Sequence, residues 1–242
     1  MIGIFSALSA SICWTYACFI WRSQTITNRP LDINLLKNLF AFVFFFPVFF
    51  TLKDTIQYKY LILLLLSGVI GIGFGDTFYL KSLKLIGTRK TLSVEALSPI
   101  LAAFSGDFFI NENVSFKSWI GTIIVSISLI SIIKYNNNLI DNKYNFSTSY
   151  FTFKNYIYSL LSILCAVFGA LLSRYVFLET NLNPLQTTEI RLLGSLIFLL
   201  IISRFKINFF LNNLKLSEKI SFIFSILLGT NIGIYLQQLV FQ

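Results

Sequence analysis

Histidine is absent from this sequence, and charged residues are scarce. Without histidine the chain can build no histidine-based metal centre, catalytic triad or proton relay. Charged side chains make up only 12% of its 242 residues, whereas soluble domains have roughly 25%. The three cysteines, Cys13, Cys18 and Cys165, lie in apolar runs and form neither a disulfide framework nor a metal-ligand spacing. We therefore expect no metal site and no cofactor.

Apolar residues are correspondingly abundant: 56% of the chain is hydrophobic, 27 residues are phenylalanine and the mean hydropathy is +0.76. A helix needs about 20 apolar residues to cross a hydrocarbon layer roughly 30 Å thick. Eight apolar runs approach or exceed this length: residues 2–21, 33–52, 60–80, 91–110, 117–134, 156–178, 184–203 and 219–242. The sequence predicts an all-α polytopic transmembrane helical bundle with about eight helices.

Positive charge exceeds negative charge, and the formal net charge is +9. The basic residues sit mainly in the short connections between apolar runs, where membrane topology places them. This placement favours the lipid bilayer as the partner and argues against nucleic acid. The loops on the amino-terminal side carry about four basic residues and the opposite loops about thirteen, a count that puts the amino terminus outside the cytoplasm.

The stretch from Gly71 to Asp107 carries an acid and a proline inside apolar segments, where both are costly. Glu95 is the first candidate for a functional group, because a carboxylic acid in an apolar site can hold a proton and release it when water enters. Pairing with Arg89 or Lys90 is the structural alternative. Pro99 lacks the N–H that would bond the carbonyl of residue 95, so a free acceptor arises next to the acid.

Asp76 follows a glycine ladder at positions 71, 73 and 75, near the end of the third apolar run. We expect a short basic connection, Lys81–Lys90, to join this run to the next one. Asp76 is a candidate site residue, because an acid at membrane depth is costly and is kept mainly where it binds a solute or an ion. Pairing with Lys81 or Lys84 is the structural alternative.

Several features recur in the same order in the two halves of the chain. The matching pairs are Pro30 with Pro184 and Lys37 with Arg191, both 154 positions apart, and Gly71 with Gly229 and Gly75 with Gly233, both 158 positions apart. A period of five helices is odd, so the second copy is inverted in the membrane. We predict a five-helix repeat over 1–134, a polar linker over 135–155, and a second repeat over 156–242. This second repeat stops after three helices, so we expect the chain to be a fragment.

Further side chains are candidates for lining a site between the repeats. Inverted repeats place their substrate site at their interface, near the membrane midplane. Lys37 and Arg191 hold equivalent positions, and they either reach the membrane surface or face a central cavity. Glu189 is the alternative partner that would neutralise Arg191. The remaining candidates are Trp14, Tyr79, Asn231 and Gln237.

The order of these features resembles the EamA-type family of the drug/metabolite transporter superfamily. The resemblance lies in Lys37 and Arg191, the run Gly71–Tyr79, the segment Ala96–Pro99, and the pair Asn111-Glu112, where the family has glycine and glutamate. It implies ten helices in two five-helix repeats and, against the charge count, an amino terminus inside the cytoplasm. It also implies movement of small metabolites, amino acids or drugs across the cytoplasmic membrane, often coupled to protons.

We therefore expect a multi-pass protein of the cell (inner) membrane, not an enzyme, that carries a small-molecule solute by alternating access. The first, third, fourth, sixth and eighth helices would line its central site. The alternative is a non-transporting membrane scaffold or subunit whose partner completes the bundle. A homodimer is compatible with either hypothesis.

Overall fold

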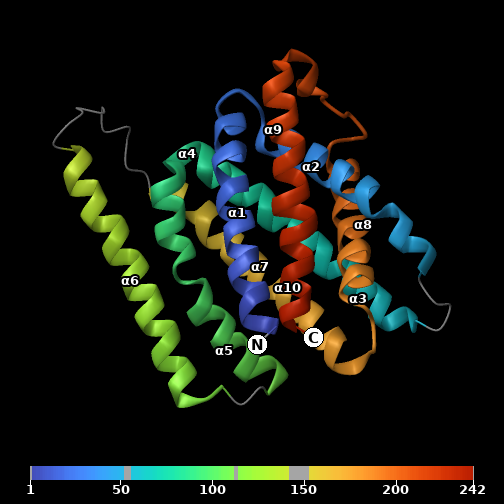
Figure 1. Cartoon of the computed structure of the whole chain (residues 1–242), viewed down its shortest axis with the longest axis horizontal. Helices are drawn as coiled ribbons and strands as arrows, with labels where there is room; N and C mark the ends of the chain where they lie inside the picture. The colour runs from blue at the N-terminus through green and yellow to red at the C-terminus, as the bar shows by residue number, and fades with distance from the viewer. Residues whose placement is uncertain (1, 52–55, 112–113, 142–152, 242) are drawn as a thin grey trace.

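The computed structural model describes residues 2–51, 56–111, 114–141 and 153–241 (Figure 1). These residues form helices and short connections, with no strand among them. Six of their helices are long and apolar enough to cross a membrane. Two shorter apolar segments accompany them, the helix Ser98–Ile110 and the first part, Phe116–Ser128, of a longer helix. The predicted all-α polytopic membrane fold is confirmed.

The helices follow the order of the predicted apolar runs. The first half contains α1 (Ile2–Thr27), α2 (Pro30–Phe45), η1 (Phe46–Thr51), α3 (Tyr58–Gly68), η2 (Val69–Gly75), α4 (Asp76–Glu95), α5 (Ser98–Ile110) and α6 (Phe116–Asp141). The second half contains α7 (Phe153–Glu179), α8 (Pro184–Ile202), η3 (Phe210–Asn213), α9 (Leu216–Ile226), η4 (Leu227–Ile232) and α10 (Gly233–Phe241). Proline opens both α2 and α8, where its missing N–H costs no helical hydrogen bond.

A single residue, Gly87, reverses the chain inside α4. Its φ of 79° and ψ of 170° are not helical, and glycine adopts a positive φ without strain. The hydroxyls of Ser82 and Thr91 are 2.8 Å apart across this turn, whereas nine residues of straight helix would separate them by about 13 Å. The predicted connection Lys81–Lys90 was therefore wrong as a loop, because only Gly87 in it leaves the helical conformation.

Two short π-helical segments, η2 and η4, continue α3 and α9. Leu216 and Leu227, which begin α9 and η4, each lie 158 positions after the residues that begin α3 and η2. A π segment widens the helix and offers carbonyl groups to side chains of other helices. Trp14 Nε1 on α1 donates a hydrogen bond of 2.8 Å to the Gly229 carbonyl of η4. Asn34 Nδ2 on α2 donates to a carbonyl of η2, that of Ile72, at 3.0 Å.

The two halves of the chain pack crosswise against each other. Helix α1 packs on η4 and α10, and α7 packs on η2 and α4. In Figure 1, α1 runs up from the amino terminus while α7 runs down, and α10 ends at the level where α1 begins. Helices α1 and α7, which begin the two predicted repeats, thus run in opposite directions, as an inverted repeat requires, and the repeat itself stays a prediction. The division at 135–155 stays a prediction, because residues 142–152 lie outside those described.

Glycines allow the closest of these helix contacts. Gly169 of α7 lies directly against Gly71 of η2, and Ser67 Oγ donates a hydrogen bond of 2.6 Å to the Gly169 carbonyl. Between α3 and α8, Gly194 packs against the backbone of Leu65. Within a bilayer, where lipid is as apolar as leucine, close backbone packing of this kind is what holds helices together.

We expect Gly169→Ala to destabilise the protein by roughly 1–3 kcal/mol through overpacking. A Cβ at this position would lie 2.6 Å from Gly71 Cα and 2.9 Å from its nitrogen, both backbone atoms. Gly121→Ala on α6 is the matched control, because no described atom outside its own helix backbone lies within 4 Å of the position that a Cβ would take. Thermal unfolding in lipid nanodiscs measures both variants, and equal melting temperatures would contradict the proposed close contact.

Candidate functional site: a central polar cavity

A cavity of about 300 Å³ lies between the two halves of the bundle. Its lining comes from α1, α2, η2, α4, α5, α7, α8, η4 and α10. Of the residues selected from the sequence, those that line it are Trp14, Lys37, Asp76, Tyr79, Glu95, Arg191 and Gln237. The structure thus brings most of the predicted site residues together around one space.

Two of the predicted site residues lie elsewhere. Asn231 is buried beside α2, where its Nδ2 donates a hydrogen bond of 2.8 Å to the Ala41 carbonyl. Pro99 is not part of the lining, although its neighbour Ser98 is. Pro99 instead opens α5 after the turn that ends α4 at Glu95. Neither residue therefore lines the cavity, although both lie on elements that do, η4 and α5.

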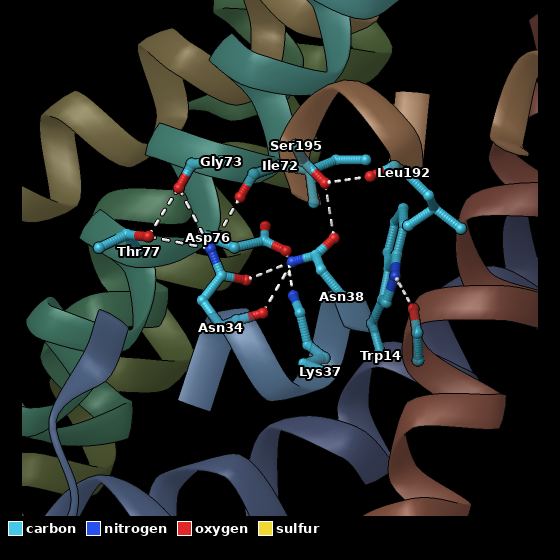
Figure 2. Close-up of polar contacts among 11 residues, drawn as sticks. Trp14, Asn34, Lys37, Asn38, Ile72, Gly73, Asp76, Thr77, Leu192 and Ser195 are labelled. Atoms are coloured by element: carbon cyan, nitrogen blue, oxygen red, sulfur yellow. Dashed lines mark hydrogen bonds and ion pairs between the residues drawn. The ribbon is translucent and has the colours of Figure 1, made fainter. Parts of the chain in front are cut away.

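Lys37 and Asp76 form an ion pair at the edge of the cavity (Figure 2). The Lys37 side chain is only 1% exposed, and its ammonium group also lies 4.7 Å from the centre of the Trp21 ring. This arrangement excludes the alternative in which Lys37 reaches the membrane surface. The structural alternative for Asp76 fails too, because Lys84 donates to the Asn28 carbonyl and Lys81 lies over the Tyr158 ring.

A network of amide and hydroxyl groups surrounds this ion pair (Figure 2). Asn34 Nδ2 donates to Thr77 Oγ1 at 2.9 Å, in addition to carbonyls of η2. Asn38 Nδ2 donates to Asn34 Oδ1 at 2.9 Å, and Ser195 Oγ of α8 donates to Asn38 Oδ1 at 2.7 Å. The network joins α2, η2 and α8. Sequence reasoning missed it, although two asparagines one turn apart beside a lysine in an apolar helix were a usable signal.

Arg191 reaches the cavity from α8 and is 3% exposed. Its Nη2 lies 3.3 Å from the position that a Cβ on Gly71 would occupy, so the glycine makes room for the guanidinium group. Within the described residues, no hydrogen-bond partner contacts its Nε or Nη1. Glu189 does not supply one, because both of its carboxylate oxygens are also buried without a described partner. Residues two apart on a helix do not face each other.

Glu95 faces the cavity from the end of α4. Ser162 Oγ of α7 donates a hydrogen bond of 2.8 Å to its Oε1. The same hydroxyl lies 2.8 Å from the Ser159 carbonyl, so its single proton can serve only one of these two acceptors at a time. The carboxylate of the first half is therefore bonded to a helix of the second half.

Tyr79 and Gln237 complete the polar lining from α4 and α10. Gln237 lies 158 positions after Tyr79, and both side chains border the same cavity. Tyr79 Oη donates to Cys18 Sγ at 3.0 Å. The two repeat-related positions thus contribute hydrogen-bonding groups from opposite halves.

A second hollow, of about 560 Å³, lies between the start of α3 and the α7–α8 connection. It is larger than the central cavity. Among the described residues that line it, the charged one is Glu179, which is exposed, and Tyr60 Oη lies 3.4 Å from its carboxylate. Ionisable groups placed in water need no function to explain them, whereas those at membrane depth do. The central cavity is therefore the candidate site.

This fold and cavity define a polytopic helical membrane protein with a charged chamber between two halves. A family model described as the EamA-like transporter family matches residues 1–134. The chain belongs to this family. The structure also accounts for a departure in its motif: Asn111 ends α5 at a φ of 56°, a left-handed conformation that asparagine tolerates almost as glycine does. Glu112, the second residue of that motif, lies outside the described residues.

Two other proteins resemble this chain. An uncharacterized transporter of Archaeoglobus fulgidus is 24% identical over 133 residues, which are 53% of this chain and 47% of that protein. The chain thus spans about half the length of this curated relative. A solved crystal structure has a TM-score of 0.60 at 17% identity, over 96% of this chain and 79% of the other. That similarity shows the fold alone.

We expect Asp76→Asn to destabilise the protein more than Lys37→Met does. The first change leaves a 1% exposed ammonium group without its counter-charge, whereas the second leaves a carboxylate that is 33% exposed. Removing one partner of a buried ion pair costs about 3–5 kcal/mol, mainly through the charge left behind. Thermal unfolding of both variants and of the double variant gives the coupling free energy, and additive losses would contradict a direct ion pair.

Proposed function

We propose that this protein is a secondary transporter that moves a small solute across the cell (inner) membrane by alternating access, with the central cavity as its binding site. The observation that carries this proposal is the meeting of buried charged side chains from both halves in one chamber. Ionisable groups at membrane depth are expensive and mark solute or ion pathways. A volume of about 300 Å³ suits a solute the size of a metabolite or an amino acid.

The crosswise packing of the halves supports a rocking movement. Because α1 packs on the second half and α7 on the first, a tilt of one half changes the cavity walls on both sides. The segments that permit such a tilt are irregular: the π segments η2 and η4, and the turn at Ala96 and Leu97 before Pro99. The cavity would then open to one side of the membrane at a time.

We assign the coupled proton to Glu95. When this carboxylate is ionised, the Ser162 hydroxyl bonds it and holds α4 against α7. When it is protonated, it is a weaker acceptor, and the Ser162 hydroxyl can bond the Ser159 carbonyl instead, 2.8 Å away. A proton would therefore alter a contact between the halves, which is what coupling to alternating access requires.

We expect Glu95→Gln to abolish solute-driven proton movement while the protein remains folded. The uncharged amide can accept the Ser162 hydrogen bond but cannot bind or release a proton at the cavity. Proteoliposomes that contain a pH-sensitive dye would receive a panel of amino acids, small carboxylates and amines, and the dye would report proton entry. Glu179→Gln is the matched control, since this exposed residue lies outside the cavity.

Unchanged proton movement in Glu95→Gln would remove this residue from the mechanism. If no solute of the panel drives proton movement in the wild-type protein, and none is exchanged across the liposome membrane, transport by this chain is contradicted. The rival hypothesis of a non-transporting membrane subunit would then be favoured. Size-exclusion profiles of all variants establish that each is folded.

A further inference from the structure

The equivalent basic residues of the two halves differ in whether an acid neutralises them. In the first half, Lys37 is neutralised by Asp76. In the second half, Arg191 stands 154 positions after Lys37, while the position 158 after Asp76 is occupied by Ile234. Ile234 also lines the cavity. The second half therefore has the cation of the pair without the anion.

Among the described groups around the cavity, Asp76 acts on Arg191 electrostatically, but no acid forms an ion pair with it. Nε and Nη1 of Arg191 are buried without a partner in the part of the chain that the structure describes. The Asp76 carboxylate is held by Lys37, and Oε1 of Glu95 accepts from Ser162. A buried guanidinium that lacks an ion-pair partner is costly. A protein can keep such a buried charge when a bound ligand supplies the missing counter-charge.

We infer that Arg191 binds the carboxylate group of a monoanionic solute. In the second half this carboxylate does what Asp76 does in the first half, since Ile234 occupies the position equivalent to Asp76. This inference deepens the proposed function, on which it rests, by naming the solute class. A guanidinium presents two parallel N–H groups that match the two oxygens of a carboxylate. Because Asp76 neutralises Lys37, the chamber has a net charge of +1 while Glu95 is protonated. This charge suits a monoanion better than the dianion of a phosphate.

The rest of the lining suits the remainder of such a solute. Trp14 and Trp21 of α1 and Tyr79 of α4 contribute aromatic surface, and Gln237 offers an uncharged hydrogen-bonding group. The Trp14 ring is fixed by its bond to the Gly229 carbonyl. A compact apolar or aromatic body with a single carboxylate therefore matches the cavity in charge, size and surface.

Benzoate tests the inference, with benzamide and benzylamine as probes of similar shape and different charge. The whole chain is placed in phosphatidylcholine nanodiscs, which contain no anionic lipid, and binding is measured by tryptophan fluorescence and calorimetry. We expect benzoate to bind at least roughly tenfold more tightly than either control probe. Equal binding of the three probes, or displacement of benzoate by an equal concentration of inorganic phosphate, would overturn the assignment.

Variants of Arg191 separate binding from folding. Arg191→Gln removes an unpaired buried charge, so we expect a melting temperature equal to or above that of the wild type together with a loss of roughly tenfold or more in benzoate affinity. Arg191→Lys keeps the charge but loses the paired N–H groups, and we expect an intermediate affinity. A fall in melting temperature without a change in benzoate affinity would assign Arg191 a structural role and overturn the inference.

Ile234 offers a second and independent test. Ile234→Asp gives the second half an acid at the position equivalent to Asp76. We expect this acid to neutralise Arg191 and abolish benzoate binding. Ile234→Asn is the matched control of similar size, and we expect it to retain binding. Full benzoate binding by Ile234→Asp would contradict the proposed exchange of acid for solute.

The outcomes also distinguish this inference from the proposed function. Proton movement that is driven by benzylamine or benzamide but not by benzoate, and that survives Arg191→Gln, would leave transport standing and refute the carboxylate assignment. Benzoate binding that depends on Arg191 but causes no proton or solute movement in proteoliposomes would support the site and refute transport.

Discussion

A buried ammonium group in hydrocarbon must have a counter-charge, and the contact between Lys37 and Asp76 meets this requirement. It joins the middle of α2 to the junction of η2 and α4. That position fixes where the cavity lies, because Trp21, Arg191 and the π segment η2 are arranged around the same pair. The amide network of Asn34 and Asn38 then holds α2 and α8 in register with it.

The π segments show how the fold places irregular backbone inside a membrane. Carbonyl groups in such segments need donors, since no water is available in the bilayer core. Asn34 supplies donors to η2, and Trp14 supplies one to η4. The same segments are positioned by glycines, so that Gly71 approaches Gly169 and leaves space for Arg191. The same two glycine-containing segments, η2 and η4, therefore determine the irregular backbone, the close helix packing and the space for the cavity.

Much of this could be predicted from the sequence, because hydrophobic length and repeated spacing are properties of a single chain. The apolar runs, the equivalence of Lys37 and Arg191, and the charged residues that line the cavity were identified in this way. The partners were not: Asp76 bonds Lys37 and not its neighbours on α4, and Glu95 bonds Ser162 across the repeat boundary. Such contacts depend on the rotation and tilt of each helix, which only packing determines.

The two helical arms of α4 are joined by one non-helical residue, Gly87, with no flexible loop between them. Asp76 lies roughly 16 Å before this point and Glu95 roughly 12 Å after it, measured along two stiff arms at 1.5 Å per residue. The separation of the two carboxylates is consequently governed by the angle at which the arms diverge from a shared pivot. The width of the chamber is therefore set by the angle between the two arms at Gly87. A change of a few degrees in this angle would move Asp76 and Glu95 apart or together.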